Sequence, residues 1–357
     1  MSAGEPGLSE LADSIAAYES RMRAELGDRF DAEGLERKHK RMREHPFLFL
    51  RATCWRWAEA APLICPELMD APRAPSVGDA HAGNFGLWRD AGARLVWGVN
   101  DFDEAARLPW PLDLVRLGAS ISLAVPDWKA DAIADAILDG YREGAAAPGP
   151  WVLERDHLWL RDAFAANDAQ REGFWAELQQ AEPARVVPPE LRDALVAALP
   201  EPGLEPVFSK REAGAGSLGR GRFVAWCEHR GGPLAIEVKA MLPSCWQAGR
   251  EPGLADTMLR GRHRSPDFSC RYGARFVVRR LAPNSRKLTF AEIGRALAGK
   301  LVRAMGTDLA SIHACEAEAQ AAVRADLKHR RGHRWLADAI ERVARWTVKE
   351  HKAYAAT

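Results

Sequence analysis

The chain has 357 residues, and its 50 Lys and Arg against 49 Asp and Glu give a formal net charge of +1. A chain this close to neutral has no general attraction for polyanions, so we expect no nucleic-acid partner. Hydrophobic residues make up 47% of the chain, yet no stretch approaches the roughly eighteen consecutive apolar residues of a membrane span, so we expect a globular protein without a membrane partner.

The N-terminal residues and the cysteines indicate a cytoplasmic location. Residues 1–20 are polar and lack the apolar core of a signal peptide. The six cysteines are scattered and form no C-x-x-C pair, so we expect reduced thiols rather than a zinc site or a disulfide framework. The length fits one large two-lobed domain or two domains, and it leaves the oligomeric state open.

The first part of the chain is predicted to be helical. Residues 9–45 have a charged, helical pattern that ends in the basic run 38–43, which we interpret as a solvated helix face. Pro46 then opens an apolar segment over residues 47–57, which is typical of a buried helix.

A group of polar residues follows. Asp79, His81 and Asn84 lie on one short loop, and Asp101 and Asp103 follow downstream. Carboxylate and amide oxygens suit magnesium, and an acid beside them suits proton transfer from a hydroxyl group. So many acidic side chains close together are costly without a cation, which favours a functional site over an ordinary surface loop.

The residues between these two acidic stretches predict a β-hairpin. Residues 85–88 and 94–99 are short apolar runs, and residues 89–92 form a turn signal between them. A hairpin would bring Asn84 and Asp101 together at its open end.

Helices are expected after the hairpin. Asp113 is a plausible N-cap for an apolar helix over residues 114–125, and residues 129–200 are mostly helical by composition. The Pro and Gly residues of segment 200–203 mark a boundary. Segment 126–200 is expected to contribute to the wall of an acceptor site.

The pattern changes to β-strands from residue 205 to residue 282 and returns to helix after residue 289. We therefore divide the chain into a helical region (1–200), a β-rich region (201–288) and returning helices (289–357). The predicted strands are 207–210, 223–226, 234–238 and 275–278.

A second group of residues lies in the β-rich region. Residues 214–219 match G-x-G-x-x-G, and a strand that follows ends at Lys239. A dinucleotide-binding loop would open a helix, whereas a glycine-rich hairpin followed by a strand lysine is the order of a kinase phosphate clamp. The alternative is an ordinary flexible hairpin with a surface lysine. The acidic partner of Lys239 is left open among Glu251, Asp256 and, less favoured, Glu237.

These motifs resemble known phosphotransferases. The loop Gly78-Asp79-x-His81-x-x-Asn84 is similar to the catalytic loop of aminoglycoside and choline phosphotransferases, and residues 99–117 resemble their metal-binding strand and the following helix. The chain as a whole resembles the uncharacterised bacterial family named domain of unknown function 2252 (DUF2252). That likeness covers roughly residues 35–315, and the segments that carry it are 41–42, 46–47, 78–86, 100–104, 214–219 and Lys239.

The resemblance implies a fold and also a departure from it. The expected fold class is α+β, a two-lobed protein kinase-like fold with a small antiparallel β lobe and a larger helical lobe. In kinase-like proteins the glycine-rich lobe precedes the catalytic loop, whereas here it follows. Residues 291–314 resemble the helix that normally runs into that loop. We infer a circular permutation, which exposed chain ends tolerate.

The same resemblance implies roles for the residues. Asp79 orients or deprotonates the acceptor, Asn84 and Asp101 hold Mg²⁺, and Asp103 is a second metal or orienting candidate. His81 is a catalytic candidate for which bracing of the loop is the favoured role, and Asp113 caps its helix or fixes the loop backbone. Residues expected to bind the phosphates of ATP are Gly214, Gly216, Ser217, Gly219 and Lys239. Strand 278–281 would lead to a hinge whose backbone meets adenine, although its two arginines fit exposed strand charges equally well.

Several functions remain open at this stage. The favoured one is an ATP- and Mg²⁺-dependent phosphotransferase acting on a hydroxyl or amine of an unidentified small-molecule or protein acceptor. Nucleotidyl (AMP) transfer and a nucleotide-binding pseudokinase are alternatives on the same fold. A further alternative is a metal-dependent hydrolase that uses Asp79, His81, Asp101 and Asp103. This function would not require the glycine-rich hairpin. Nucleic-acid binding through basic segment 328–334 is weak because the net charge is balanced.

Overall fold

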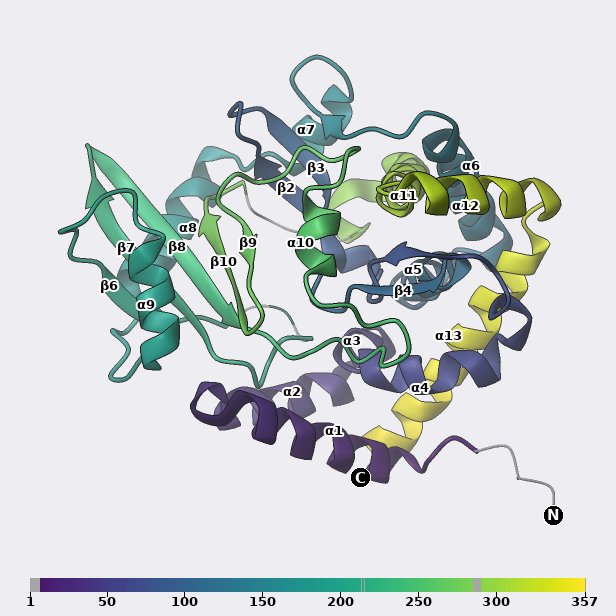
Figure 1. The fold of residues 1–357 in the computed structure, drawn as a ribbon, viewed down its shortest axis with the longest axis horizontal. Helices are drawn as coiled ribbons and strands as arrows, with labels where there is room; N and C mark the ends of the chain where they lie inside the picture. Colours follow the sequence, from purple (N-terminus) through teal and green to yellow (C-terminus); the bar gives the residue numbers. More distant parts are fainter. Residues whose placement is uncertain (1–6, 213, 215, 285–289, 357) are drawn as a thin grey trace.

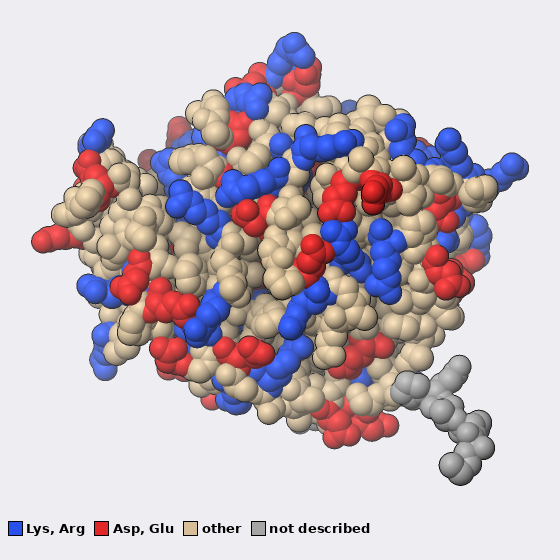
Figure 2. Space-filling view, viewed as in Figure 1, with Lys and Arg blue, Asp and Glu red and all other residues tan. Residues whose placement is uncertain are grey.

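A computed structural model describes residues 7–212, 214, 216–284 and 290–356 of the chain. The molecule is a mixed α+β protein, as predicted (Figure 1). A five-stranded sheet lies at one side, helices form most of the rest, and helices α1 and α2 run along the bottom of the view. On the face drawn in Figure 2, acidic and basic side chains are interspersed, in keeping with the balanced net charge.

The N-terminal part is helical, but it is more divided than predicted. Residues 9–45 form α1 (Leu11–Leu26) and α2 (Ala32–Glu44), separated by a short 3-10 turn that Gly27 opens with a φ of 55°. The apolar segment after Pro46 also forms two helices rather than one. These are α3 (Pro46–Ala52) and α4 (Cys54–Ile64).

The basic run 38–43 is not the wholly solvated face that we predicted. Lys38 and Met42 are each only 1% exposed. They lie four residues apart on α2, so both side chains face inward on one side of the helix. The ammonium of Lys38 lies 5.0 Å from the rings of Tyr18 and Trp55, which form its inner surroundings.

The predicted hairpin is confirmed. Strands β2 (Phe85–Arg89) and β3 (Leu95–Val99) pair antiparallel, with Phe85 opposite Val99. The Asp90 carboxylate accepts the backbone N–H groups of Gly92 and Arg94 and so fixes the turn. Four described strands were not predicted: β5 (Trp151–Val152) beside β3, the pair β1 (Arg73–Ser76) and β4 (Ala106–Pro109), and β9 (Arg271–Tyr272).

The helical body packs around α5, which is buried on nearly every side. Helices α6 and α11 pack closely because they meet at glycines: a β-carbon added at Gly140 would lie 1.8 Å from the Arg303 carbonyl oxygen. Helix α13 packs along α5, and its end reaches α2, where Tyr354 hydrogen-bonds His39. The body contains α5 (Pro111–Ala124), α6 (Ala130–Ala146), α11 (Phe290–His313), α12 (Ala317–His329) and α13 (Arg334–Ala355).

The β-rich region forms one antiparallel sheet in the order β6-β7-β8-β10-β9. Helix α9 (Pro189–Ala197) packs on one face, and Leu178 of α8 (Asp168–Gln180) packs on the other. The strands are β6 (Val207–Lys210), β7 (Arg222–His229), β8 (Gly232–Ala240), β9 (Arg271–Tyr272) and β10 (Phe276–Leu281).

Two short helices complete the described structure, α7 (Leu158–Phe164) and α10 (Leu254–Leu259). Among the helices of the described residues, none combines the length and the apolar character needed to cross a bilayer.

Candidate functional site

Residues from both groups predicted from the sequence line one cavity of about 290 Å³, whereas Gly219 and Lys239 are not among its lining residues. The helical part contributes the loop around Asp79, and the sheet contributes the loop between β6 and β7. Helix α8 adds Phe174 to the wall, so segment 126–200 reaches the cavity, and its role in binding an acceptor stays a prediction. The predicted site residues that line the cavity are Asp79, His81, Asn84, Asp101, Asp103, Gly214, Gly216 and Ser217.

The loop that carries Asp79 is fixed from behind by Asp113. The carboxylate of Asp113 accepts the backbone N–H groups of Val77 at 2.7 Å and Gly78 at 3.0 Å. His313 Nε2 lies 3.1 Å from the same carboxylate, and all of these groups are buried. Helix α5 begins at Pro111 with Trp110 as its N-cap, so Asp113 fixes the loop backbone and is not the N-cap.

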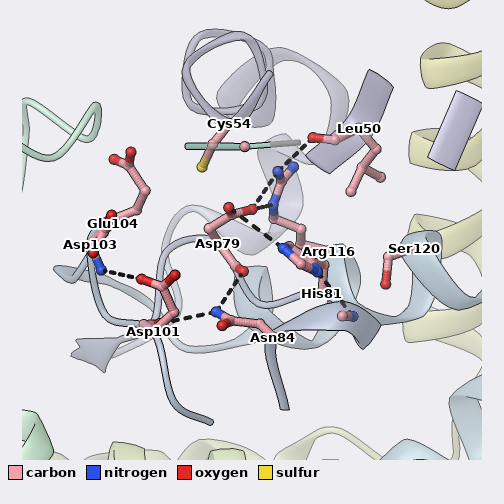
Figure 3. A network of polar contacts seen from close by, with 12 residues as sticks. Leu50, Cys54, Asp79, His81, Asn84, Asp101, Asp103, Glu104, Arg116 and Ser120 are labelled. Atoms are coloured by element: carbon pink, nitrogen blue, oxygen red, sulfur yellow. Dashed lines mark hydrogen bonds and ion pairs between the residues drawn. The ribbon is translucent and has the colours of Figure 1, made fainter. Parts of the chain in front are cut away.

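Asp79 is held by a buried arginine. Its Oδ1 accepts from Arg116 Nε at 2.7 Å, and Arg116 also donates to the Leu50 carbonyl oxygen (Figure 3). Burial raises the pKa of the Asp79 carboxyl to about 6, although the Arg116 guanidinium opposes this change. Asp79 therefore gains or loses a proton near neutral pH, which suits a group that accepts a proton during a reaction.

His81 braces the loop, as predicted. Its Nδ1 accepts the backbone N–H of Gly83 at 3.1 Å, and its Nε2 lies 3.9 Å from Asp79 Oδ2. The next backbone N–H, that of Ala82, donates to Ser120 Oγ on α5. These bonds fix the loop geometry between Asp79 and Asn84.

Asn84 connects the loop to the second acidic stretch. Its Nδ2 donates to the Asp101 carbonyl oxygen at 3.0 Å (Figure 3), as the hairpin predicted. Its Oδ1 is buried at the cavity and has no hydrogen-bond partner among the described residues, and the same is true of Asp103 Oδ1. Two buried acceptor oxygens without donors fit a hard cation, which prefers oxygen ligands.

Lys239 joins the sheet to the acidic stretch. The residue is 2% exposed, and its ammonium lies 2.7 Å from Asp103 Oδ2 and 3.3 Å from Asp101 Oδ2. None of the three candidates for its acidic partner was right, because the partners come from the loop after β3. The three candidates bind arginines instead: Glu251 pairs with Arg107, Asp256 with Arg260, and Glu237 with Arg211, Arg222 and Arg279.

The face of the sheet toward the cavity is strongly charged. In the strand register, Arg222 of β7 lies opposite Lys239 of β8, and Arg279 of β10 lies opposite Glu237 of β8. Lys239 and Glu237 are two residues apart on β8, so all four side chains lie on the same face of the sheet. Glu237 is 1% exposed and contacts arginine nitrogens at 2.7 to 3.0 Å. The surrounding guanidinium groups hold the pKa of its carboxyl well below the usual range even though burial opposes this.

The glycine-rich loop joins β6 to β7, so it is the hairpin loop that we predicted. Gly214 has a φ of 68°, and Ser217 Oγ accepts from Arg222 at 2.7 Å. Gly219 does not line the cavity: its carbonyl oxygen accepts from the Asp31 backbone, and its α-carbon packs against Met22. Two residues of this loop, Ala213 and Ala215, lie outside the described residues.

The predicted hinge region is described only in part. Arg279 of β10 is directed inward and lines the cavity, whereas Arg280 is exposed. Pro283 also lines the cavity, and residues 285–289 lie outside the description.

Sequence reasoning missed several residues of this site. Arg220 joins Asp103 and Glu104 at 2.8 and 3.1 Å. Arg51, which lines the cavity, and Arg116, which binds Asp79, were also missed. In the sequence both look like ordinary arginines of a helix. Their one signal is position: each lies within an apolar helical stretch, where a buried charge needs a partner.

These features define a mixed α+β protein in which a polar cavity lies between a helical part and an antiparallel sheet. Residues 29–181 match the sequence profile of a family described as "Uncharacterized protein conserved in bacteria (DUF2252)". The match supports the predicted resemblance to that family over less than half of the chain, and it ends before the sheet begins. Comparisons with curated proteins and with solved structures found no significant match.

Proposed function

We propose that this protein is an ATP- and magnesium-dependent phosphotransferase acting on a hydroxyl or amine acceptor. The observation that carries the proposal is the shared cavity. It brings a proton-accepting carboxylate (Asp79), oxygen ligands for a cation (Asn84 and Asp101) and a glycine-rich hairpin together. A phosphotransferase needs these groups in one place because its catalysis consists mainly of positioning and charge stabilisation.

The proposed fold is a permuted kinase-like one, with the phosphate-binding sheet after the catalytic loop in the chain. Two observations support it. The carboxylate of Asp113, on the helix after the acidic stretch, fixes the backbone at Val77 and Gly78, and α11 ends beside it at His313. The permutation itself remains a prediction, because it concerns chain order relative to other proteins.

The cation site is proposed at Asn84 and Asp101, with Asp103 beside them. Asn84 Oδ1 and Asp103 Oδ1 lack donors among the described residues, and both residues line the cavity. Magnesium bound there would neutralise charge on the phosphates. Lys239 keeps Asp101 and Asp103 in position and supplies a positive charge beside them.

The proposed reaction is an in-line transfer. The acceptor oxygen or nitrogen forms a bond to the terminal phosphorus of ATP, and the bond from that phosphorus to its bridging oxygen breaks to leave ADP. Asp79 orients the acceptor and takes its proton, and Arg116 fixes the Asp79 carboxylate for this task. The products are the phosphorylated acceptor and ADP.

Nucleotide binding is the first test. ATP with magnesium should raise the melting temperature of the wild-type protein, because ligand at about 100 times its Kd adds about 2.7 kcal/mol to the stability. The shift should shrink without magnesium and disappear in Lys239→Met. Lys349→Met, on the exposed surface of α13, is the matched control and should keep the full shift.

Turnover is the second test. Consumption of labelled ATP in the presence of a metabolite library should vanish in Asp101→Ala. An unchanged thermal shift in Lys239→Met, or full turnover in Asp101→Ala, would reject the assigned roles. ATP binding without any turnover would favour the pseudokinase, and release of pyrophosphate instead of ADP would favour nucleotidyl transfer.

A further inference from the structure

We propose that Arg51 recognises the terminal phosphate of the nucleotide, at the point where the two loops of the cavity meet. The inference rests on the proposed function, and it adds a residue that lies in neither of the two motifs. Arg51 belongs to the last turn of α3, which ends at Ala52.

The guanidinium of Arg51 lies against both loops. A β-carbon built on Gly83, in the Asp79 loop, would be 3.2 Å from Arg51 Cζ. A β-carbon built on Gly214, in the glycine-rich loop, would be 3.9 Å from Arg51 Nη2. The backbone of Arg51 also approaches Gly216, so the end of α3 lies between the two loops.

Arg51 differs from the other charged groups of the cavity in having no ion-pair partner within 4.0 Å among the described residues. Among the described residues, each other cavity-lining arginine, aspartate and glutamate has an oppositely charged partner within 4.0 Å, and no such partner is found for Arg51. Its guanidinium contacts the Phe47 ring, and its buried Nε has no hydrogen-bond acceptor in the described part of the chain. A desolvated cation of this kind is costly unless an anion binds to it.

A second cation lies under the glycine-rich loop. Lys38 is buried and donates to the Gly216 carbonyl oxygen at 3.3 Å, and no carboxylate within the described residues pairs with it. Burial lowers the pKa of Lys38 to about 7. Arg51 and Lys38 are therefore two basic side chains beside the glycine-rich loop for which the described residues supply no ion-pair partner within 4.0 Å.

The position of Arg51 identifies which phosphate it would contact. The group that must reach both the glycine-rich loop and the Asp79 loop is the phosphoryl group that moves from ATP to the acceptor. A guanidinium can donate two parallel hydrogen bonds to phosphate oxygens, which an ammonium cannot. ADP lacks this phosphoryl group, so the contact with Arg51 would be absent.

The test compares two nucleotides by isothermal titration calorimetry, with magnesium present. The wild-type protein should bind a non-hydrolysable ATP analogue more tightly than ADP. Arg51→Gln should weaken binding of the analogue about ten-fold or more, the value of a charged hydrogen bond, and change binding of ADP by less than about two-fold. Arg51→Lys keeps the charge but loses the paired donors, and it should fall between wild type and Arg51→Gln.

Controls separate this inference from the proposed function. Arg155→Gln removes an arginine whose side chain is 90% exposed, and it should bind both nucleotides as the wild type does. Unchanged analogue affinity in Arg51→Gln, or an equal loss for both nucleotides, would overturn the role of Arg51 and leave the phosphotransferase proposal standing. A wild-type protein that binds neither nucleotide would remove the proposed function and this inference with it. If circular dichroism shows that Arg51→Gln does not fold, the affinities of Arg51→Lys for the ATP analogue and for ADP are compared in its place.

Discussion

Individual residues of this site are held in environments that favour reactivity over stability. Asp79 is the clearest case, since burial raises its pKa to about 6 even with Arg116 beside it. The folded protein therefore holds this proton more tightly than the unfolded chain does. The stability that this group contributes is present below its unfolded pKa and is lost as the pH rises through about 6.

Catalytic activity should increase as the pH rises, whereas the stability contributed by Asp79 decreases. Asp79 must be ionised to accept a proton, so turnover of ATP should rise through pH 6 and level off above it. Asp79→Asn should lower turnover about 10²- to 10⁴-fold, the usual contribution of a general base, and leave nucleotide affinity nearly unchanged. Measuring turnover against pH for both proteins checks this. A flat profile between pH 5 and pH 8 in the wild type would contradict the assignment.

At the scale of elements, the helices behind the site pack through glycines. Gly140 of α6 and Gly306 of α11 allow the two backbones to approach, and a β-carbon at Gly306 would lie 2.2 Å from the Ile137 carbonyl oxygen. Helix α11 ends at His313, which contacts the Asp113 carboxylate behind the Asp79 loop. The position of α11 against α6 therefore fixes one support of the loop.

Gly140→Ala should separate these helices and destabilise the protein by about 1–3 kcal/mol, as overpacking of a close contact does. Gly173→Ala is the control, because Gly173 lies in α8 with no atom within 4 Å of its added β-carbon. That change should be neutral or stabilise by about 0.5–1 kcal/mol, the difference between alanine and glycine in a helix. Urea denaturation of both variants measures the two effects. Equal stability of the two variants would be inconsistent with the close helix contact.

At the scale of the whole molecule, the cavity joins segments that are far apart in the chain. Arg51, Asp79 and Arg222 line it, and they come from α3, from the loop after β1 and from β7. The final helix α13 packs along α5 and reaches α2, so it supports the same assembly from the outside (Figure 1). We expect the molecule to depend on its last helix.

A chain that ends at Gly332 loses α13, whose inner residues are buried, among them Leu336, Ile340 and Val343. Removing so much apolar contact should abolish a cooperative thermal transition, because each buried side chain of this kind contributes about 1.5–3 kcal/mol. A chain that ends at Ala355 keeps the helix and should unfold as the full chain does. Differential scanning calorimetry compares the two. A cooperative transition in the shorter chain at the full-length temperature would show that α13 is dispensable.

Local features of the sequence were sufficient to predict much of the fold and the approach of Asn84 to Asp101 in the site. The two short apolar runs around a turn signal predicted the β2–β3 hairpin, and that hairpin placed Asn84 beside Asp101. The glycine-rich loop between two strands was predicted in the same way. Turn chemistry and apolar periodicity act over a few residues, so one sequence is enough to recognise them.

The tertiary structure alone decided which charges meet. Lys239 pairs with Asp101 and Asp103, Glu237 gathers three arginines, and Arg51 is left without a carboxylate among the described residues. Ion pairs form between side chains that folding brings together from distant segments, and no short-range pattern records such a pairing. The chain's own sequence specified the strands, helices and reactive residue types, whereas their packing determined which residues face the cavity and which charges remain available to a ligand.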